Sequence, residues 1–191
     1  MTDMELLRRE CLACTACPLC KERTSVVFGV GAVNTDVVFV GEGPGQQEDL
    51  TGEPFVGAAG KLLDEMLNII DLGRHNCYIC NIVKCRPPHN RDPLPQEQDA
   101  CIGYLQRQLE IIRPKIIVCL GRIAAQRLIK EDFRITREHG TWFDKDGVQY
   151  MAMYHPSALL RDVNKRPEAF RDLMLLRNMV TALGCMGEER K

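Results

Sequence analysis

Four short apolar segments, separated by stretches with helical spacing, constrain the fold of this chain more than any other feature of its sequence. They lie at residues 36–41, 77–83, 115–121 and 150–154. Short and nearly continuous apolar runs are typical of strands that are buried on both faces of a parallel sheet. Because helices are expected between them, the sequence predicts an α/β fold with a central, mainly parallel, four-stranded sheet flanked by helices.

The intervening stretches place apolar residues at the three- and four-residue spacing of amphipathic helices. Helices are expected at residues 4–10, from Gly57 onward, and at residues 96–113, 122–130 and 170–183, and a hairpin is expected within residues 134–153. The chain has no internal repeat and no linker, and its 191 residues fit one domain. We therefore predict a single domain over residues 1–191, in which residues 11–20 form an N-terminal cysteine-rich segment.

Charge and hydropathy exclude some functions. No apolar run approaches the ~20 residues that span a bilayer, and the acidic start at residues 1–5 is unlike a secretory signal, so we expect a cytoplasmic protein without membrane association. The net charge of −1 gives no general attraction to nucleic acid. Basic residues nevertheless gather in two loops, which are either solvated or hold phosphates: Lys84, Arg86, His89 and Arg91 in one, and Arg161, Lys165 and Arg166 in the other.

Three of the expected strands run directly into unusual polar loops. These loops are residues 41–45, 81–88 and 155–157. Parallel strands bring their carboxyl ends to one edge of a sheet, and ligands of such folds bind in the crevice beyond that edge. The sequence therefore predicts an active site where these three loops meet.

The ten cysteines indicate metal binding or catalysis, because structural disulfides are disfavoured in a reducing compartment. Cys14 and Cys17 have the two-residue separation of a chelating pair, and thiolate ligands suit zinc or an iron–sulfur cluster. The neighbouring pairs Cys11/Cys14 and Cys17/Cys20 have the same separation, so spacing alone does not choose between them.

The remaining cysteines divide by their surroundings. Cys85 lies in the loop after the second strand and is a further candidate ligand, whereas Cys101 shares an apolar helix face with leucines and is interpreted as core on that pattern. Cys119 lies within an apolar strand and is expected in the core. Cys77 and Cys80 are expected to point to opposite faces of their strand rather than to form a second metal pair.

Individual residues of the polar loops carry weaker signals. The Gly-rich loop 41–45 suits either a phosphate cradle or a tight turn, and Phe55 could stack on a base or anchor its loop. Asn81 offers both a donor and an acceptor, as reading a pyrimidine edge requires, although asparagines at strand ends also cap turns. His155 opens a loop beside Pro-Ser and is a candidate for catalysis.

Six motifs occur in a specific order along the chain: ACTACPL with a following Arg-Thr, VGEGPG, GEPFVGAAGKLL, CNIVKCRPP, CLGRIAA and HPSALLR. In this order and spacing the chain resembles the family 4 uracil-DNA glycosylases, the iron–sulfur branch of the uracil-DNA glycosylase superfamily. The resemblance runs from about Cys11 to about Arg177.

The resemblance implies a DNA repair enzyme of base excision repair. Such an enzyme flips uracil out of DNA and hydrolyses its N-glycosidic bond, which leaves an abasic site. No protein nucleophile is required, so we expect a monofunctional hydrolase that does not cleave the strand. Uracil-containing DNA is the expected partner, downstream base excision repair enzymes are possible further partners, and a monomer is expected.

The resemblance also implies a [4Fe-4S] cluster held by four cysteines. It selects Cys14, Cys17, Cys85 and Cys101 as the ligands and thus overrules the interpretation of Cys101 as core. Cys11 and Cys20 remain as extra cysteines. We expect the cluster to shape the DNA-binding surface rather than to carry out redox chemistry, because Cys85 belongs to the basic loop.

The resemblance gives the polar loops their roles. Phe55 would stack on the extruded uracil, Asn81 would bind its pyrimidine edge and discriminate against cytosine, and His155 would stabilise charge on the uracil oxygen. Further residues are assigned by position: Gly41 to substrate binding, Glu42 and Gly43 to the pocket near the attacking water, Glu48 as the alternative catalytic carboxylate, and Leu159 or Leu160 with Arg161 to the loop that enters the duplex.

The chain departs from the family pattern at Gln46 and Gln47, where relatives usually carry acidic residues. Three other functions are alternatives. A related glycosylase could accept a broader range of deaminated bases. An electron-transfer protein could hold a ferredoxin-like cluster on the four cysteines of residues 11–20, and a DNA-binding module could hold zinc.

Overall fold

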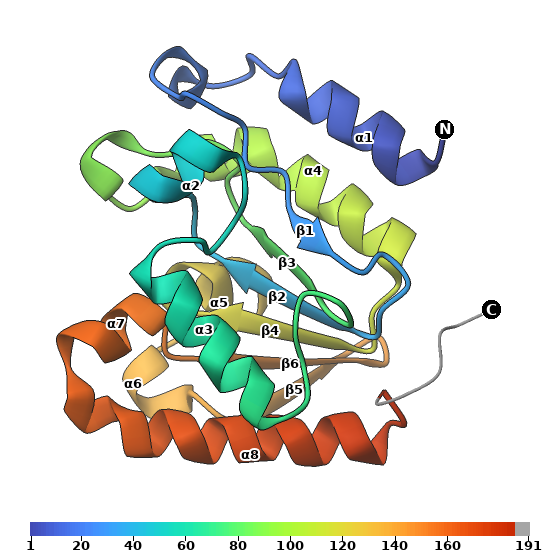
Figure 1. The fold of residues 1–191 in the computed structure, drawn as a ribbon, viewed down its shortest axis with the longest axis vertical. Coiled ribbons are helices and arrows are strands. Elements are labelled where there is room, and N and C mark those ends of the chain that lie inside the picture. The colour runs from blue at the N-terminus through green and yellow to red at the C-terminus, as the bar shows by residue number, and fades with distance from the viewer. Residues whose placement is uncertain (186–191) are drawn as a thin grey trace.

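A six-stranded sheet forms the centre of the molecule in the computed structural model, which describes residues 1–185 (Figure 1). The strand order is β1-β3-β2-β4-β6-β5. The four central strands β2 (Val37–Gly41), β3 (Tyr78–Asn81), β4 (Ile116–Leu120) and β6 (Val148–Met153) are parallel, which confirms the predicted α/β class. The end of the predicted domain, residues 186–191, lies outside the described residues.

The prediction of four strands was incomplete, because two short antiparallel strands lie at the sheet edges. β1 (Val30–Gly31) is only two residues long and pairs with β3. β5 (Trp142–Lys145) is partly exposed and forms the expected hairpin with β6. The two residues of its turn, Asp146 and Gly147, both have positive φ angles (54° and 83°), as the tightest hairpin turns require.

Helices connect the strands and cover both faces of the sheet. Their bounds are α1 Asp3–Leu12, α2 Gln46–Thr51, α3 Ala58–Ile69, α4 Pro95–Ile112, α5 Arg122–Leu128, α6 Ile135–Glu138, α7 Pro156–Arg161 and α8 Arg166–Ala182. Single 3-10 turns occur at Pro18–Lys21, Pro88–Asn90 and Val163–Lys165. Among residues 1–185, no helix has the length and apolar character needed to cross a membrane.

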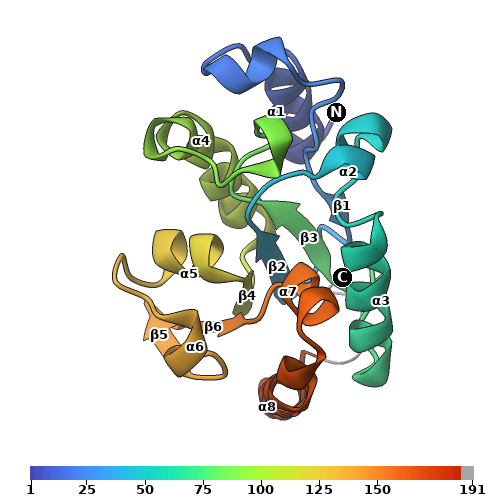
Figure 2. The ribbon, with the colours of Figure 1, turned by 90° about the vertical axis from the view of Figure 1, so that its left-hand side faces the viewer.

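Two hydrophobic cores lie on the two faces of the sheet. On one face, Val38 and Val40 pack with the buried sides of α1, α4 and α5, and on the other Val37 and Phe39 pack with those of α3 and α8 (Figure 2). Cys80 belongs to the first core and Cys77 to the second, as the alternation of side chains along residues 77–80 predicts.

Candidate active site

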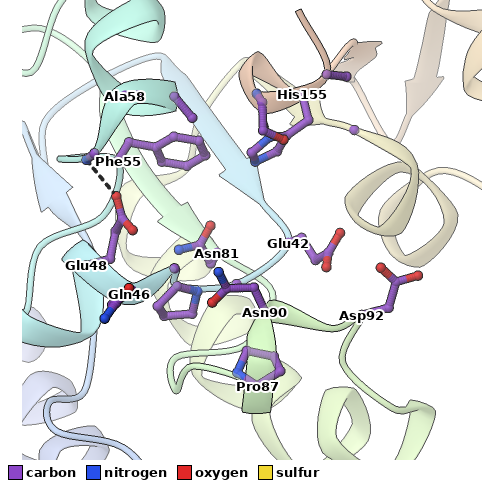
Figure 3. A pocket seen from close by; sticks show the side chains of 18 of the residues that line it. Glu42, Gln46, Glu48, Phe55, Ala58, Asn81, Pro87, Asn90, Asp92 and His155 are labelled. Carbon is purple, nitrogen blue, oxygen red and sulfur yellow. Dashed lines mark hydrogen bonds between the residues drawn. The ribbon is translucent and has the colours of Figure 1, made fainter. Parts of the chain in front are cut away.

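The carboxyl ends of the central strands meet at one edge of the sheet, where a pocket of about 590 Å³ opens (Figure 3). The predicted convergence of the three polar loops is therefore present. Of the residues assigned to the active site from the sequence, the pocket is lined by Glu42, Gly43, Glu48, Phe55, Asn81, His155 and Arg161. Gly41 lies directly behind it, because a Cβ at this position would come within 2.4 Å of Asn81 Oδ1 and 2.7 Å of Phe55 Cζ.

Phe55 is held in a strained backbone conformation, with φ of 56°. Arg74 fixes the loop from outside by donating to the carbonyl of Pro54 at 2.9 Å and to that of Phe55 at 2.5 Å. From within, Glu48 Oε1 accepts hydrogen bonds from the backbone N–H groups of Val56 and Gly57, both at 2.9 Å. The ring of Phe55 is thereby placed 5.5 Å from that of His155, centroid to centroid.

Glu48 is itself fixed by the elements around it. It lies in the first turn of α2, and the next residue, the buried Asp49, accepts hydrogen bonds from the backbone N–H groups of Thr24 (2.9 Å) and Ser25 (3.3 Å). One oxygen of Glu48 is occupied by the two N–H groups of the Phe55 loop. The geometry therefore makes Glu48 an anchor of that loop.

Asn81 ends β3 at the floor of the pocket and is only 2% exposed. Its backbone carbonyl accepts a hydrogen bond from the Lys84 ammonium at 3.0 Å. Its side-chain Oδ1 is the one buried side-chain oxygen or nitrogen among residues 1–185 with no hydrogen-bond partner. An unpaired buried acceptor is costly, so Oδ1 is poised for a donor from a ligand.

Glu42 follows β2 and projects toward Asp92 (Figure 3). Burial, together with repulsion by Asp92, raises the pKa of Glu42 to about 7, although Arg122 acts in the opposite direction. Arg122 forms an ion pair with Asp92, with 2.5 Å between Nη2 and Oδ2. A carboxyl group with a pKa near 7 is suited to take up and release a proton at neutral pH, as a general acid or base requires.

His155 stands at the start of α7 opposite Phe55. Its Nδ1 accepts the backbone N–H of Ser157 at 3.2 Å and lies 2.7 Å from the Ser157 hydroxyl oxygen. Burial lowers the pKa of His155 to about 4, with Arg161 lowering it and Glu48 raising it. The ring is therefore neutral at pH 7, and since Nδ1 is an acceptor its proton lies on Nε2, which can donate to a ligand.

The segment that was expected to be a loop entering the duplex is instead helical, because it forms α7, and its two leucines differ in exposure. Leu159 is 1% exposed and packs in the core with Phe55 and Tyr154, whereas Leu160 is 42% exposed. Only Leu160 is therefore available to contact DNA without unfolding α7. Arg161 follows it and lines the pocket.

A second, smaller cavity is lined by six cysteines, namely Cys11, Cys14, Cys17, Cys20, Cys85 and Cys101. Three of the four predicted ligand sulfurs accept N–H hydrogen bonds: Cys14 from Ala16 (3.5 Å), Cys85 from the Arg23 guanidinium (3.2 Å) and Cys101 from the Lys84 backbone (3.2 Å). Cys101 is 8% exposed, so it is buried as its helix pattern predicts and also faces this cavity.

The donor set fits an iron–sulfur cluster. Thiolates are the usual ligands of such clusters, and N–H donors to the sulfurs are the usual way in which a protein stabilises them. In the described part of the chain no three His, Cys, Asp or Glu side chains are gathered closely enough to hold a single metal ion. The six cysteines line one common cavity, as the ligands of a cluster do.

Several residues of both sites were missed or misplaced by sequence reasoning. Asp92 and Arg122 both line the pocket and contact each other. The sequence does not indicate this contact, because 30 residues separate them. Lys84 was placed in a basic surface loop, which is wrong, since it is only 1% exposed. Arg91 of the same loop pairs with Glu97 at 2.7 Å.

Comparison with known proteins gives the family of this chain. The model of the uracil DNA glycosylase superfamily matches residues 28–175. Type-4 uracil-DNA glycosylases are similar over most of their length: that of Archaeoglobus fulgidus is 49% identical over 176 residues (88% of each chain). That of Thermotoga maritima is 48% identical over 161 residues (83% of this chain, 84% of the relative). A type-5 uracil-DNA glycosylase of Pyrobaculum aerophilum is 32% identical over 174 residues, 82% of this chain and 76% of the relative.

The chain, whose α/β sheet carries this pocket at its carboxyl edge, therefore belongs to the uracil-DNA glycosylase superfamily. Within it the chain is a member of the type-4 branch, which confirms the resemblance found in the sequence motifs.

Proposed function

We propose that this protein removes uracil from DNA by hydrolysing the bond between the base and its sugar. The observation that carries the proposal is the orphaned Oδ1 of Asn81 at the floor of the pocket. The N3–H of uracil would donate to this oxygen, while the Asn81 amide would donate to the uracil O4. Cytosine presents an acceptor and a donor in the reverse order, so it would leave both groups unsatisfied.

The other pocket residues complete a site for a flipped base. Phe55 would stack on the pyrimidine ring, and the Nε2–H of His155 would donate to a uracil oxygen as negative charge develops on the departing base. A neutral imidazole suits this role, because His155 would donate a hydrogen bond to the uracil oxygen without transferring its proton.

Glu42 is the carboxylate that we assign to the attacking water. One oxygen of Glu48 is already occupied by the two N–H groups of the Phe55 loop, whereas Glu42 faces the open pocket. In its ionised form Glu42 would accept a proton from the water that attacks the sugar. Among the described residues the pocket is lined by no lysine, so no amine is available to form a covalent intermediate and cleave the strand.

The cofactor that we propose is a [4Fe-4S] cluster on Cys14, Cys17, Cys85 and Cys101. These residues come from the N-terminal segment, the loop after β3 and the first turns of α4. When bound, the cluster would cross-link these segments and so fix the loop that follows Asn81. The same loop carries Arg86 and Arg91, and Leu160 with Arg161 would enter the duplex beside it.

We extend the proposal to the chain as a whole. Residues 1–191 would form one catalytic domain that acts as a cytoplasmic monomer, and its abasic product would pass to downstream base excision repair enzymes.

The experiment is incubation of the purified protein with a labelled duplex that contains one uracil, followed by alkali. Cleavage with uracil and not with thymine, and only after alkali, is the expected result. Strand cleavage before alkali would contradict the monofunctional reaction. Asn81→Ala should lose activity, and Asn90→Ala, at the pocket rim, is the matched control. No cleavage by cluster-loaded protein would refute the proposal.

A further inference from the structure

The most unusual buried group outside the pocket is the ammonium of Lys84. The residue is 1% exposed, and its Nζ donates to the carbonyl of Asn81 at 3.0 Å and to Oε1 of Gln108 at 2.6 Å. Both acceptors are neutral. In the part of the chain that the structure describes, none of the ion pairs between side chains involves Lys84.

A buried charge without an opposite charge is expensive, and proteins pair such charges or coordinate them. The groups around Lys84 that can become negative are cysteines. Lys84 lines the cysteine cavity together with Cys11, Cys85 and Cys101, and its own backbone N–H donates to Cys101 Sγ at 3.2 Å. An iron–sulfur cluster with thiolate ligands carries a net negative charge, so a loaded cavity would supply the missing counter-charge.

Lys84 also connects this cavity with the base-reading end of β3. Its backbone N–H donates to Cys101 Sγ, and its carbonyl accepts the N–H of Val27 at 2.8 Å. Its side chain turns back to the carbonyl of Asn81, three residues earlier. Gln108, the second acceptor, is itself fixed because its Nε2 donates to the carbonyl of Phe28 and the hydroxyl of Tyr78, both at 3.0 Å.

We propose that Lys84 is the internal counter-ion of the iron–sulfur site and the residue that positions Asn81 for uracil recognition. The inference rests on the proposed function, since it assumes both the cluster and the reading of uracil by Asn81. It assigns Lys84 a role that depends on its positive charge and that a neutral hydrogen-bond donor could not fill. Lys84 is thus a positioning residue, which acts on the base through Asn81.

The test is Lys84→Met, which keeps an unbranched side chain of similar length and removes its charge. Lys21→Met is the matched control, because Lys21 follows Cys20 but is exposed. In protein with full iron and sulfide content, Lys84→Met should shift the cluster midpoint potential to more negative values, since a nearby positive charge favours the reduced cluster. It should also raise KM for the uracil duplex several-fold more than it lowers kcat. Lys21→Met should leave KM unchanged and shift the potential less.

A second variant keeps the inference testable where Lys84→Met does not fold. Gln108→Glu retains the lysine and the size of its partner but places a negative charge next to Nζ. It should shift the potential in the same direction as Lys84→Met. An unchanged potential in cluster-loaded Gln108→Glu, or in loaded Lys84→Met, would overturn the counter-ion role.

The counter-ion role and the proposed function can be refuted independently, because the midpoint potential tests the first and the uracil assay tests the second. Wild-type protein that holds a cluster but releases no uracil would refute the proposed function, while the potential shift would still decide the role of Lys84 at the cluster. A normal KM in Lys84→Met that has the expected potential shift would overturn the positioning of Asn81.

Discussion

Glu48 offers a sharp test of how the Phe55 loop is held. Its Oε1 accepts two backbone N–H groups, at Val56 and Gly57, and these bonds support a residue with a positive φ angle. A hydrogen bond to a charged group contributes about 1.5–3 kcal/mol. Removing both acceptor contacts at this partly exposed position should therefore cost about 3 kcal/mol of loop ordering, which corresponds to about a 150-fold loss in kcat/KM.

The assay is single-turnover cleavage of a uracil duplex by Glu48→Ala, with Glu48→Gln and Glu53→Ala as comparisons. The glutamine retains an acceptor oxygen for the loop, so it should lose less than about tenfold. Glu53 is exposed and its replacement should change little. Wild-type activity in Glu48→Ala would refute the anchoring role. An equal loss in Glu48→Gln and Glu48→Ala would instead show that the charge of Glu48 takes part in the reaction.

Three further predictions concern pH, DNA and the cluster. Because the pKa of Glu42 is about 7, kcat/KM should fall as the pH drops below 7, and Asp92→Asn, which removes a repulsive charge that raises this pKa, should move the fall to lower pH in a pH–rate profile. Leu160→Ala should reduce activity on duplex DNA more than on single-stranded DNA, since the exposed side chain would fill the space of the flipped base; equal losses on the two substrates would contradict this. Cys101→Ser should lose the cluster, measured as iron, sulfide and visible absorbance, whereas Cys20→Ser should retain it; the reverse result would favour a ferredoxin-like site within residues 11–20.

The central strands were predictable because burial on both faces leaves a simple pattern. β2 and β4 are buried at every position, and such runs of apolar residues are hard to read as anything else. β1 and β5 leave no comparable pattern. The first is only two residues long, and the second is an edge strand with two exposed residues, which the sequence indicated only as part of a hairpin within residues 134–153.

The position of the pocket followed from topology, but its electrostatics did not. Parallel strands bring Asn81 and His155 to one edge whatever the loops contain. The pKa of Glu42 is raised by its burial and by Asp92, and Asp92 comes from a loop whose path the sequence does not specify.

The burial of Lys84 likewise could not be predicted from the sequence. A lysine between Val83 and Cys85 in a loop with several arginines is expected at the surface, because lysines are rarely buried. Only the three-dimensional structure shows that its side chain turns inward to Asn81 and Gln108.

The most direct test of the central claim is to measure the released base itself. Cluster-loaded protein is incubated with a duplex that contains one uracil, and free uracil is quantified by mass spectrometry beside the number of alkali-labile sites. One free uracil for each alkali-labile site, with no strand cleavage before alkali and none of either product from Asn81→Ala, is the predicted result. Alkali-labile sites without free uracil, or unchanged release by Asn81→Ala, would contradict the account.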